Sequence, residues 1–387
     1  MRIAVITNAY PPRVSGGAAR IASIYSEELI ALGHEVRVWK ATEMFDRLDT
    51  THPLRRLFFH LRDLGARSQT VEEVLAWKPD ALLTHTLTGC GHATPKAIQK
   101  KGIRWAHILH DVQLIDPSGQ VMFGEGHSLL RVSWRWCWSS LRKRAFGNPD
   151  AVVSPTEWLL NFHQTWGWFK GAQVRVIPNP IHLTLPSPSL GEGSAGRSLR
   201  TSSPSEGEEA GGEVGRGSGR VRSIVFVGRL DPDKGLLILL DAWKRLADAT
   251  ACLVIIGKGS LAHFVTSQSA SRIDYPGEQP SSVVLQKMRE SRVVVVPSLV
   301  MENQSTVILE GLSAGCRVVA SDVGGNRETL GGAGTIVAPG DVEALAIALH
   351  QALDDQKDHS MEIEKTLSLH EPLKCTQRLV ELLKSNL

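Results

Sequence analysis

The sequence predicts an α/β protein made of two Rossmann-like, doubly wound domains, each built on a parallel sheet. Three observations predict this fold. The chain has 387 residues, enough for two domains with separate cores. Apolar β-type runs alternate with helically spaced apolar residues in both halves of the chain. Between the halves, residues 187–222 are rich in Gly, Ser, Glu and Arg and have almost no large apolar side chain.

The composition is that of an ordinary globular protein, with 42% apolar and 21% charged residues. The net charge of +3 gives no reason to expect a nucleic-acid partner. Five cysteines without CxxC spacing indicate reduced thiols, which are typical of the cytosol. The N-terminus MRIAVITNAY has too short an apolar run for a signal peptide, and no window reaches transmembrane length. We therefore expect a cytoplasmic protein.

The chain opens as a doubly wound domain opens. A strand at 3–7, a polar loop with Gly16 and Gly17, a helix at 18–32 and a strand at 34–40 follow in that order. The loop lacks GxGxxG and the second strand lacks a terminal acidic residue, which argues against a dinucleotide site. The two glycines either let backbone amides approach an anion or a hydroxyl-rich ligand, or form a turn that serves helix packing.

The alternation then continues to the end of the first half. Helices are predicted at 54–78, 94–101 and 157–166, and strands at 80–84, 103–109, 150–154 and 173–177. His110 follows one of these strands, at the carboxyl edge where open α/β sheets bind ligands. This histidine either donates a hydrogen bond to a sugar hydroxyl or a developing charge, or is structural.

Residues 128–146 form the most basic and most tryptophan-rich segment of the chain. The helical spacing predicts an apolar stripe and a neighbouring basic stripe, made respectively of Leu130, Trp134, Trp138 and Leu141, and of Arg131, Arg135 and Arg142. Such a helix either packs its tryptophan face on the domain, or lies as a peripheral contact on an anionic membrane at its inner face.

The second half opens with a strand at 224–227, a loop that starts at Gly228, a helix at 236–247 and a strand at 252–256. Within the loop, Arg229 and Lys234 precede a helix N-terminus, an arrangement that suits phosphate. The alternative is a solvated turn, which Asp231 and Asp233 also fit. The two aspartates have DxD spacing, but they neighbour two cations and lack other ligands, so no metal site is predicted.

Residues 297–328 read PSLVMENQSTVILEGLSAGCRVVASDVGGNRE, and two glutamates stand eight positions apart in them. Ser305 is expected to cap a helix that begins at Thr306 and leaves its first amides free. Glu310, on the second turn, points back toward Glu302. Two carboxylates beside free amides suit a ligand that is both sugar-like and phosphorylated. The alternative is an ordinary βα turn.

The remaining predicted elements complete the second domain. Strands are predicted at 272–275, 293–296 and 317–321, and helices at 282–290, 341–353 and 372–384. We divide the chain into a first domain (1–181), a flexible linker (182–222), a second domain (223–370) and a C-terminal helix (371–387) that packs back on the first domain.

Taken together and in their order along the chain, several motifs make this sequence resemble the glycosyltransferases of family 4. They are YPPRVSGGAAR, the HD at 110–111, VIPNP, VGRL…KG and VVVPS…E-x7-E…GG..E. The resemblance implies the GT-B fold, in which two domains face each other across a cleft. It also implies retaining, metal-independent transfer of a sugar to a hydroxyl acceptor, which is a glycan, a lipid-linked or a small molecule, in cell-envelope or exopolysaccharide biosynthesis. No cofactor is implied, because a nucleoside-diphosphate sugar is the co-substrate.

The resemblance also implies roles for the matching residues. Arg229 and Lys234 would hold the donor diphosphate, Glu302 the transferred sugar and Glu310 the ribose. His110 would bond the donor sugar and support the transition state. The donor-binding set would also include Gly16, Gly17, Gly228, Asn303, Gln304, Ser305 and Thr306.

Two departures from the family pattern stand out. The long insert occupies the interdomain linker, where it bears on hinge geometry. Residues 303–305 read Asn-Gln-Ser where many relatives have a Gly-Phe-Gly type. The identity of the sugar donor is therefore not inferred from those relatives. Two other classes stay open: an epimerase or phosphorylase on the same architecture, and a catalytically silent sugar-nucleotide-binding protein. A phosphorylase would need a cofactor lysine or an inorganic-phosphate site, and the sequence gives no clear signal for either.

Overall fold

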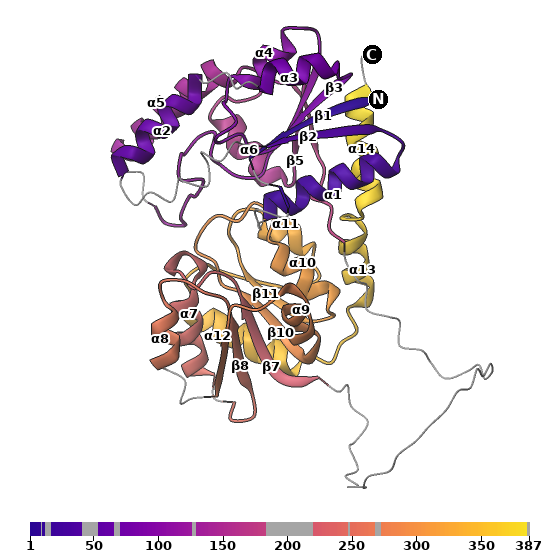
Figure 1. Cartoon of the computed structure of the whole chain (residues 1–387). Coiled ribbons are helices and arrows are strands. Elements are labelled where there is room, and N and C mark those ends of the chain that lie inside the picture. The colour runs from indigo at the N-terminus through magenta and orange to yellow at the C-terminus, as the bar shows by residue number, and fades with distance from the viewer. Residues whose placement is uncertain are drawn as a thin grey trace, which may run out of the picture.

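The computed structural model describes residues 1–8, 10–11, 17–40, 53–65, 70–125, 129–182, 220–246, 248–267 and 272–384. It contains two six-stranded sheets whose paired strands are all parallel, and helices cover both sheets (Figure 1). The predicted α/β architecture with two Rossmann-like domains is confirmed. In Figure 1 the first domain (indigo to magenta) lies above the second (orange).

The first sheet has the strand order β2-β1-β3-β4-β5-β6. Its strands are β1 (Arg2–Thr7), β2 (Glu35–Lys40), β3 (Ala81–Thr84), β4 (Arg104–Ile108), β5 (Ala151–Ser154) and β6 (Gln173–Val176). Strand β1 is apolar on both faces, because Ile3 and Val5 enter one core cluster while Ala4 and Ile6 enter another. This is why the central strands appear in the sequence as short continuous apolar runs.

Helices surround this sheet (Figure 1). The helices are α1 (Gly17–Ala31), α2 (Pro53–Gly65), α3 (Thr70–Trp77), α4 (Thr94–Gln99), α5 (Leu129–Phe146) and α6 (Glu157–Thr165). Of the helix predicted over 54–78, residues 53–65 and 70–77 are helical, and residues 66–69 lie outside the described residues.

Helix α5 corresponds to the basic, tryptophan-rich segment, but its faces differ from the prediction. Trp138, Ser139, Arg142 and Phe146 point inward. Leu130, predicted on the apolar stripe, is 84% exposed, and Arg142, predicted on the basic stripe, is fully buried. Burial lowers the pKa of the Arg142 guanidinium to about 10, opposed by nearby carboxylates.

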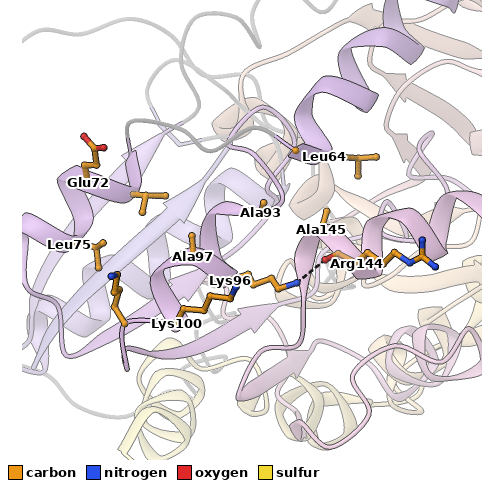
Figure 2. A pocket seen from close by; sticks show the side chains of 12 residues that line it. Leu64, Glu72, Leu75, Ala93, Lys96, Ala97, Lys100, Arg144 and Ala145 are labelled. Atoms are coloured by element: carbon orange, nitrogen blue, oxygen red, sulfur yellow. Dashed lines mark hydrogen bonds between the residues drawn. The ribbon is translucent and has the colours of Figure 1, made fainter.

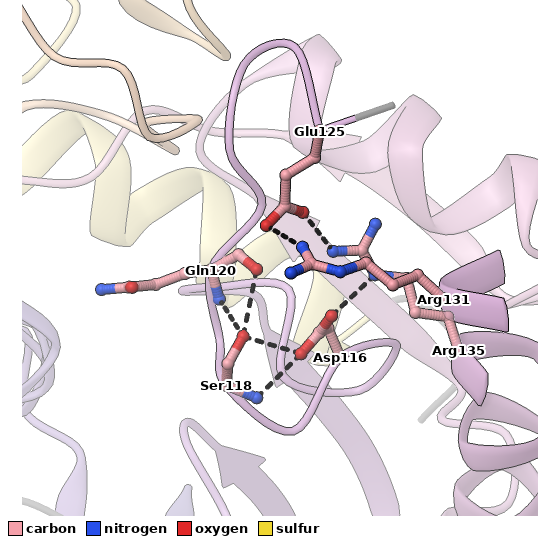
Figure 3. Close-up of polar contacts among 6 residues, drawn as sticks. All are labelled: Asp116, Ser118, Gln120, Glu125, Arg131 and Arg135. Carbon is pink, nitrogen blue, oxygen red and sulfur yellow. Dashed lines mark hydrogen bonds and ion pairs between the residues drawn. The ribbon is translucent and has the colours of Figure 1, made fainter. Parts of the chain in front are cut away.

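Two other arginines of α5 are bound by carboxylates (Figure 3). Arg135 donates to Asp116 at 2.6 Å and to Glu125 at 2.8 Å, and Arg131 also pairs with Glu125. The hydroxyl of Ser118 donates to Asp116 at 2.7 Å. The predicted basic stripe is thus largely neutralised by the loop that precedes the helix.

The second sheet has the strand order β12-β11-β10-β7-β8-β9. Its strands are β7 (Val221–Val227), β8 (Cys252–Ile256), β9 (Ile273–Gly277), β10 (Ser291–Val296), β11 (Arg317–Ser321) and β12 (Thr335–Val337). Its helices are η1 (Pro232–Lys234), α7 (Leu236–Arg245), α8 (Ala262–Ser267), α9 (Ser281–Glu290), α10 (Thr306–Ser313), α11 (Asn326–Leu330) and α12 (Val342–Asp354). Residues 183–219 of the expected linker lie outside the described residues.

The described part of the chain passes between the domains at two places. It leaves the first domain after Ile181, and it returns between α13 (Ser360–Ser368) and α14 (Pro372–Lys384). Helix α14 packs on α1, β4 and β5 of the first domain, as the yellow ribbon in Figure 1 shows. The two crossings touch, because the backbone N–H of Ile181 donates to the carbonyl of His370 at 3.1 Å.

Candidate functional site

The loops that follow the strands of the two sheets meet at the domain junction. Asn303, in the loop after β10, donates its side-chain amide to the carbonyl of His110 at 2.7 Å. The hydroxyl of Thr156 donates to the carbonyl of Asn303 at 3.1 Å, and the N–H of Met301 donates to the carbonyl of Val121 at 2.8 Å. Predicted residues from opposite domains therefore lie at one place, the carboxyl edge where open sheets bind ligands.

His110 forms one side of this site. Its Nε2 lies 2.8 Å from Nδ1 of His85, and the two rings stack with centroids 5.1 Å apart. Burial lowers the pKa of His110 to about 4, so the imidazole is uncharged near neutral pH. In that state it offers one N–H donor and one acceptor.

Glu302 and Lys234 form an ion pair within the second domain. Oε1 of Glu302 accepts from Nζ of Lys234 at 2.7 Å and from the hydroxyl of Ser298 at 2.8 Å. Gly235, at φ +72°, lets this loop approach β10, because a Cβ there would lie 1.8 Å from the carbonyl oxygen of Pro297. The glycine next to Lys234 is therefore part of what places the lysine against Glu302.

A glycine pair supports Glu302 from the other side. A Cβ on Gly324 would lie 2.0 Å from the carbonyl oxygen of Glu302, and the backbone of Gly324 is left-handed, at φ +58°. The N–H of Gly325 donates to the same carbonyl at 2.7 Å. Sequence reasoning cited these glycines only as a motif. It missed their contact with Glu302, which is more than twenty positions away.

Arg229 lies at the carboxyl end of β7, bound by its own loop. Its guanidinium pairs with Asp231 at 2.6 Å and with Asp233 at 2.5 Å. Hydrogen bonds from the N–H and hydroxyl of Ser260, together with Arg229, lower the pKa of Asp231. The DxD pair thus holds the arginine, and nowhere in the described chain do three His, Cys, Asp or Glu side chains gather as metal ligands would. Gly228 begins this loop.

Glu310, which was predicted to point back toward Glu302, pairs with a cation of the first domain. Its Oε1 lies 2.9 Å from Nη1 of Arg20 on α1. Burial raises the pKa of Glu310 and Arg20 opposes that shift. A pocket of about 240 Å³ adjoins this ion pair, and Val227 and Met288 contribute to its apolar lining. Glu302 and Glu310 therefore bind different cations, and the second cation comes from the opposite domain.

The remaining predicted residues are placed as follows. Ser305 occupies the N-cap position of α10 but makes no side-chain cap hydrogen bond, and Thr306 begins the helix. The side chain of Gln304 accepts from the backbone N–H of Asn179 and bonds the ring of His370, both at 2.9 Å. Gly17 is the exposed first residue of α1, and Gly16 lies outside the described residues.

A second pocket, of about 700 Å³, lies away from these residues (Figure 2). It is formed by α2, α3, α4 and α5, and Lys96, Lys100 and Arg144 stand among small and aliphatic side chains. Nζ of Lys96 donates to the carbonyl of Arg144 at 2.9 Å. None of the predicted site residues lines this pocket, so the functional assignment rests on the domain junction.

Two family models match the chain. Residues 15–185 match "Glycosyltransferase Family 4", and residues 221–355 match "Glycosyl transferases group 1". The two matches are consecutive. The first covers β2 to β6 of the first sheet, and the second covers all six strands of the second sheet.

Individual proteins are similar to this chain as well. An uncharacterized 42.6 kDa protein in the cps region of Klebsiella pneumoniae is 24% identical, over 85% of this chain and 87% of that protein. The phosphatidyl-myo-inositol mannosyltransferase of Mycolicibacterium smegmatis is 31% identical over 35% of this chain and 37% of its own length. Among solved structures, the HepE protein of Anabaena in complex with UDP-glucose has a TM-score of 0.64 at 17% identity, and each chain is fully covered.

Proposed function

Because this chain belongs to the family 4 glycosyltransferases, with the GT-B fold, we propose that it transfers a sugar from a nucleoside-diphosphate sugar to a hydroxyl acceptor. The single observation that carries the proposal is the arrangement around Glu302. This carboxylate binds Lys234, and the next residue, Asn303, holds the backbone of His110. Groups suited to a phosphate, a sugar hydroxyl and a developing charge therefore lie together.

In the free protein the charged side chains of the site are paired with one another. A bound sugar-nucleotide donor would replace these protein partners with its own phosphate and hydroxyl groups. Its diphosphate would take Lys234 from Glu302 and Arg229 from its two aspartates. Glu302 would then accept from hydroxyls of the sugar, and Glu310 would exchange Arg20 for the ribose hydroxyls. The free amides at the start of α10 would face the sugar and the distal phosphate.

In the proposed reaction, the bond between the anomeric carbon and the diphosphate oxygen breaks. The acceptor oxygen forms a new bond to that carbon with retention of configuration, and its proton leaves with the nucleoside diphosphate or to water. Lys234 and Arg229 stabilise the charge that develops on the departing diphosphate, so no metal is needed. The relative from a cps region and the mannosyltransferase support a role in cell-envelope or exopolysaccharide biosynthesis.

The test is release of nucleoside diphosphate from a panel of UDP-, GDP- and ADP-sugars, with and without acceptors. Acceptor-dependent release supports transfer, whereas binding without turnover indicates the silent sugar-nucleotide-binding alternative. Epimerised donor, or phosphate-dependent release of a sugar phosphate, indicates the epimerase or phosphorylase alternative. Lys234→Ala, Arg229→Ala and Glu310→Ala should each lower kcat/KM by at least about tenfold without unfolding the protein. Arg245→Ala, at an exposed ion pair of the same domain, is the matched control.

We further propose that α5 touches a membrane surface, where a lipid-linked acceptor would be presented to this cytoplasmic enzyme. The exposed side of the first half of α5 carries Leu129, Leu130, Trp134 and Trp136, the last of them 65% exposed. Tryptophan favours the interface between lipid and water. No helix in the described ranges combines the length and apolar character required to cross a bilayer.

Sedimentation with anionic vesicles tests this contact. Wild-type protein should sediment, and a variant with Trp134→Ser and Trp136→Ser should stay in the supernatant. Met361→Ser, which removes an exposed apolar side chain from the second domain, should behave as wild type. If the wild-type protein remains in the supernatant, the membrane contact is contradicted. The acceptor would then be a molecule that is not presented by a membrane.

A further inference from the structure

The role proposed for His110 depends on which ring nitrogen carries its proton, and a second imidazole lies in position to decide this. His85 directly follows β3, the neighbour of β4, so both histidines lie at the same edge of the sheet. The 2.8 Å between Nδ1 of His85 and Nε2 of His110 requires one proton between the two nitrogens. One ring therefore donates and the other accepts.

The environment of His85 indicates which ring donates. His85 is fully buried, and its Nε2 has no partner in the described part of the protein. If His110 donated, the neutral ring of His85 would hold its own proton on Nε2, a buried N–H without an acceptor. If His85 donates, its Nε2 is only an unprotonated acceptor. A buried N–H without an acceptor is rarer and more costly than a buried acceptor nitrogen without a donor.

We propose that His85 is a positioning residue that donates from Nδ1 to Nε2 of His110 and so keeps the proton of His110 on Nδ1. Nδ1 is then the nitrogen that donates to an oxygen of the donor sugar, a role that rests on the function proposed above. Burial lowers the pKa of both imidazoles, so each holds a single proton near neutral pH. The bond from Asn303 to the carbonyl of His110 fixes the backbone of the same residue. His110 then acts as a neutral hydrogen-bond donor and not as a proton donor.

The tautomer is measurable on the free protein by ¹⁵N NMR of the imidazole nitrogens near pH 8, with the His110 signals identified by their loss in His110→Ala. The expected result is a protonated Nδ1 and an unprotonated Nε2 in His110. His85→Asn keeps an N–H donor near the position of Nδ1 and should preserve this pattern. His85→Leu should move the proton of His110 to Nε2. A wild-type His110 protonated on Nε2 overturns the proposal, whether or not the protein is an active transferase.

Kinetics test the consequence. With the sugar donor and acceptor that the nucleoside diphosphate release assay identifies, His85→Leu should lower kcat by about tenfold to a hundredfold, because the site loses one correctly placed hydrogen-bond donor. His85→Asn should restore kcat to within a few-fold of wild type. His163→Leu, which removes another buried imidazole of the same domain, controls for a general loss of stability. A His85→Leu variant that has the altered tautomer but wild-type kcat overturns the positioning role. Absence of transfer in every form refutes the proposed function and leaves the tautomer result standing.

Discussion

A single methyl group added at Gly324 tests whether the contact between Gly324 and Glu302 positions the glutamate for activity. An alanine at position 324 would place its Cβ 2.0 Å from the carbonyl oxygen of Glu302 and 2.7 Å from its nitrogen. The loop would have to retreat by roughly 1 Å before the contact reached even 3.0 Å. The substitution therefore moves the backbone of Glu302 and leaves its side chain chemically intact.

The magnitude follows from three contributions. The left-handed conformation of residue 324 costs an alanine about 1–2 kcal/mol, and crowding costs about 1–3 kcal/mol. Loss of the hydrogen bond from Gly325 to Glu302 adds about 1 kcal/mol. We expect Gly324→Ala to lower the free energy of unfolding by about 3–6 kcal/mol. We also expect it to lower kcat/KM by about a hundredfold, since a displacement of 1 Å is enough for such a loss.

Gly332→Ala is the matched control, because Gly332 is also left-handed, at φ +90°, but a Cβ there meets nothing within 4 Å. It should cost only the conformational contribution of about 1–2 kcal/mol and leave the activity unchanged. Urea unfolding and the assay for nucleoside diphosphate release compare the two variants. If Gly324→Ala is no more destabilising than Gly332→Ala and remains fully active, the glycine does not position Glu302.

Three further predictions concern other parts of the molecule. Arg20→Ala should lower the donor KM by up to about fivefold, because Glu310 then has no competing cation, and a rise in KM would contradict this exchange. Burial lowers the pKa of His163 to about 4, so only the unfolded chain binds this proton between pH 6.5 and 4, and stability falls as the pH drops through that range. In urea unfolding, His163→Leu should reduce this slope by up to about 1.4 kcal/mol per pH unit, and an unchanged slope would refute the assignment. Leu379→Ala, in the buried face of α14, should cost about 2–5 kcal/mol, whereas Leu373→Ala, at a more exposed position, should cost little.

The sequence predicted the strands and the residues at their ends. Parallel strands buried on both faces appear as short apolar runs, so the segment 293–296 was identifiable without knowledge of its neighbours. His110, Lys234 and Glu302 were then predicted as site residues, because ligand-binding groups gather where such strands end. The structure places these three residues as neighbouring parts of one junction.

The pairings across the domains were not predictable from local patterns. Arg20 and Glu310 are 290 positions apart, and each alone looks like an ordinary charge on a helix. The inward face of α5 was assigned wrongly, because helical spacing locates a stripe but does not identify the surface that covers it. The partnership of His85 with His110 depends on the adjacency of β3 and β4, which only the sheet order shows.

The return of the chain to the first domain has a consequence for how the protein is made. Ribosomes deliver the N-terminal part first, and such parts generally fold as they emerge. Here the surface formed by α1, β4 and β5 receives its cover, α14, only after the entire second domain has been synthesised. Until α14 is synthesised, the apolar side chains of the first domain that it covers would remain exposed. A chain that is released after its ribosome stalls within the second domain would therefore also lack the helix that covers the first domain.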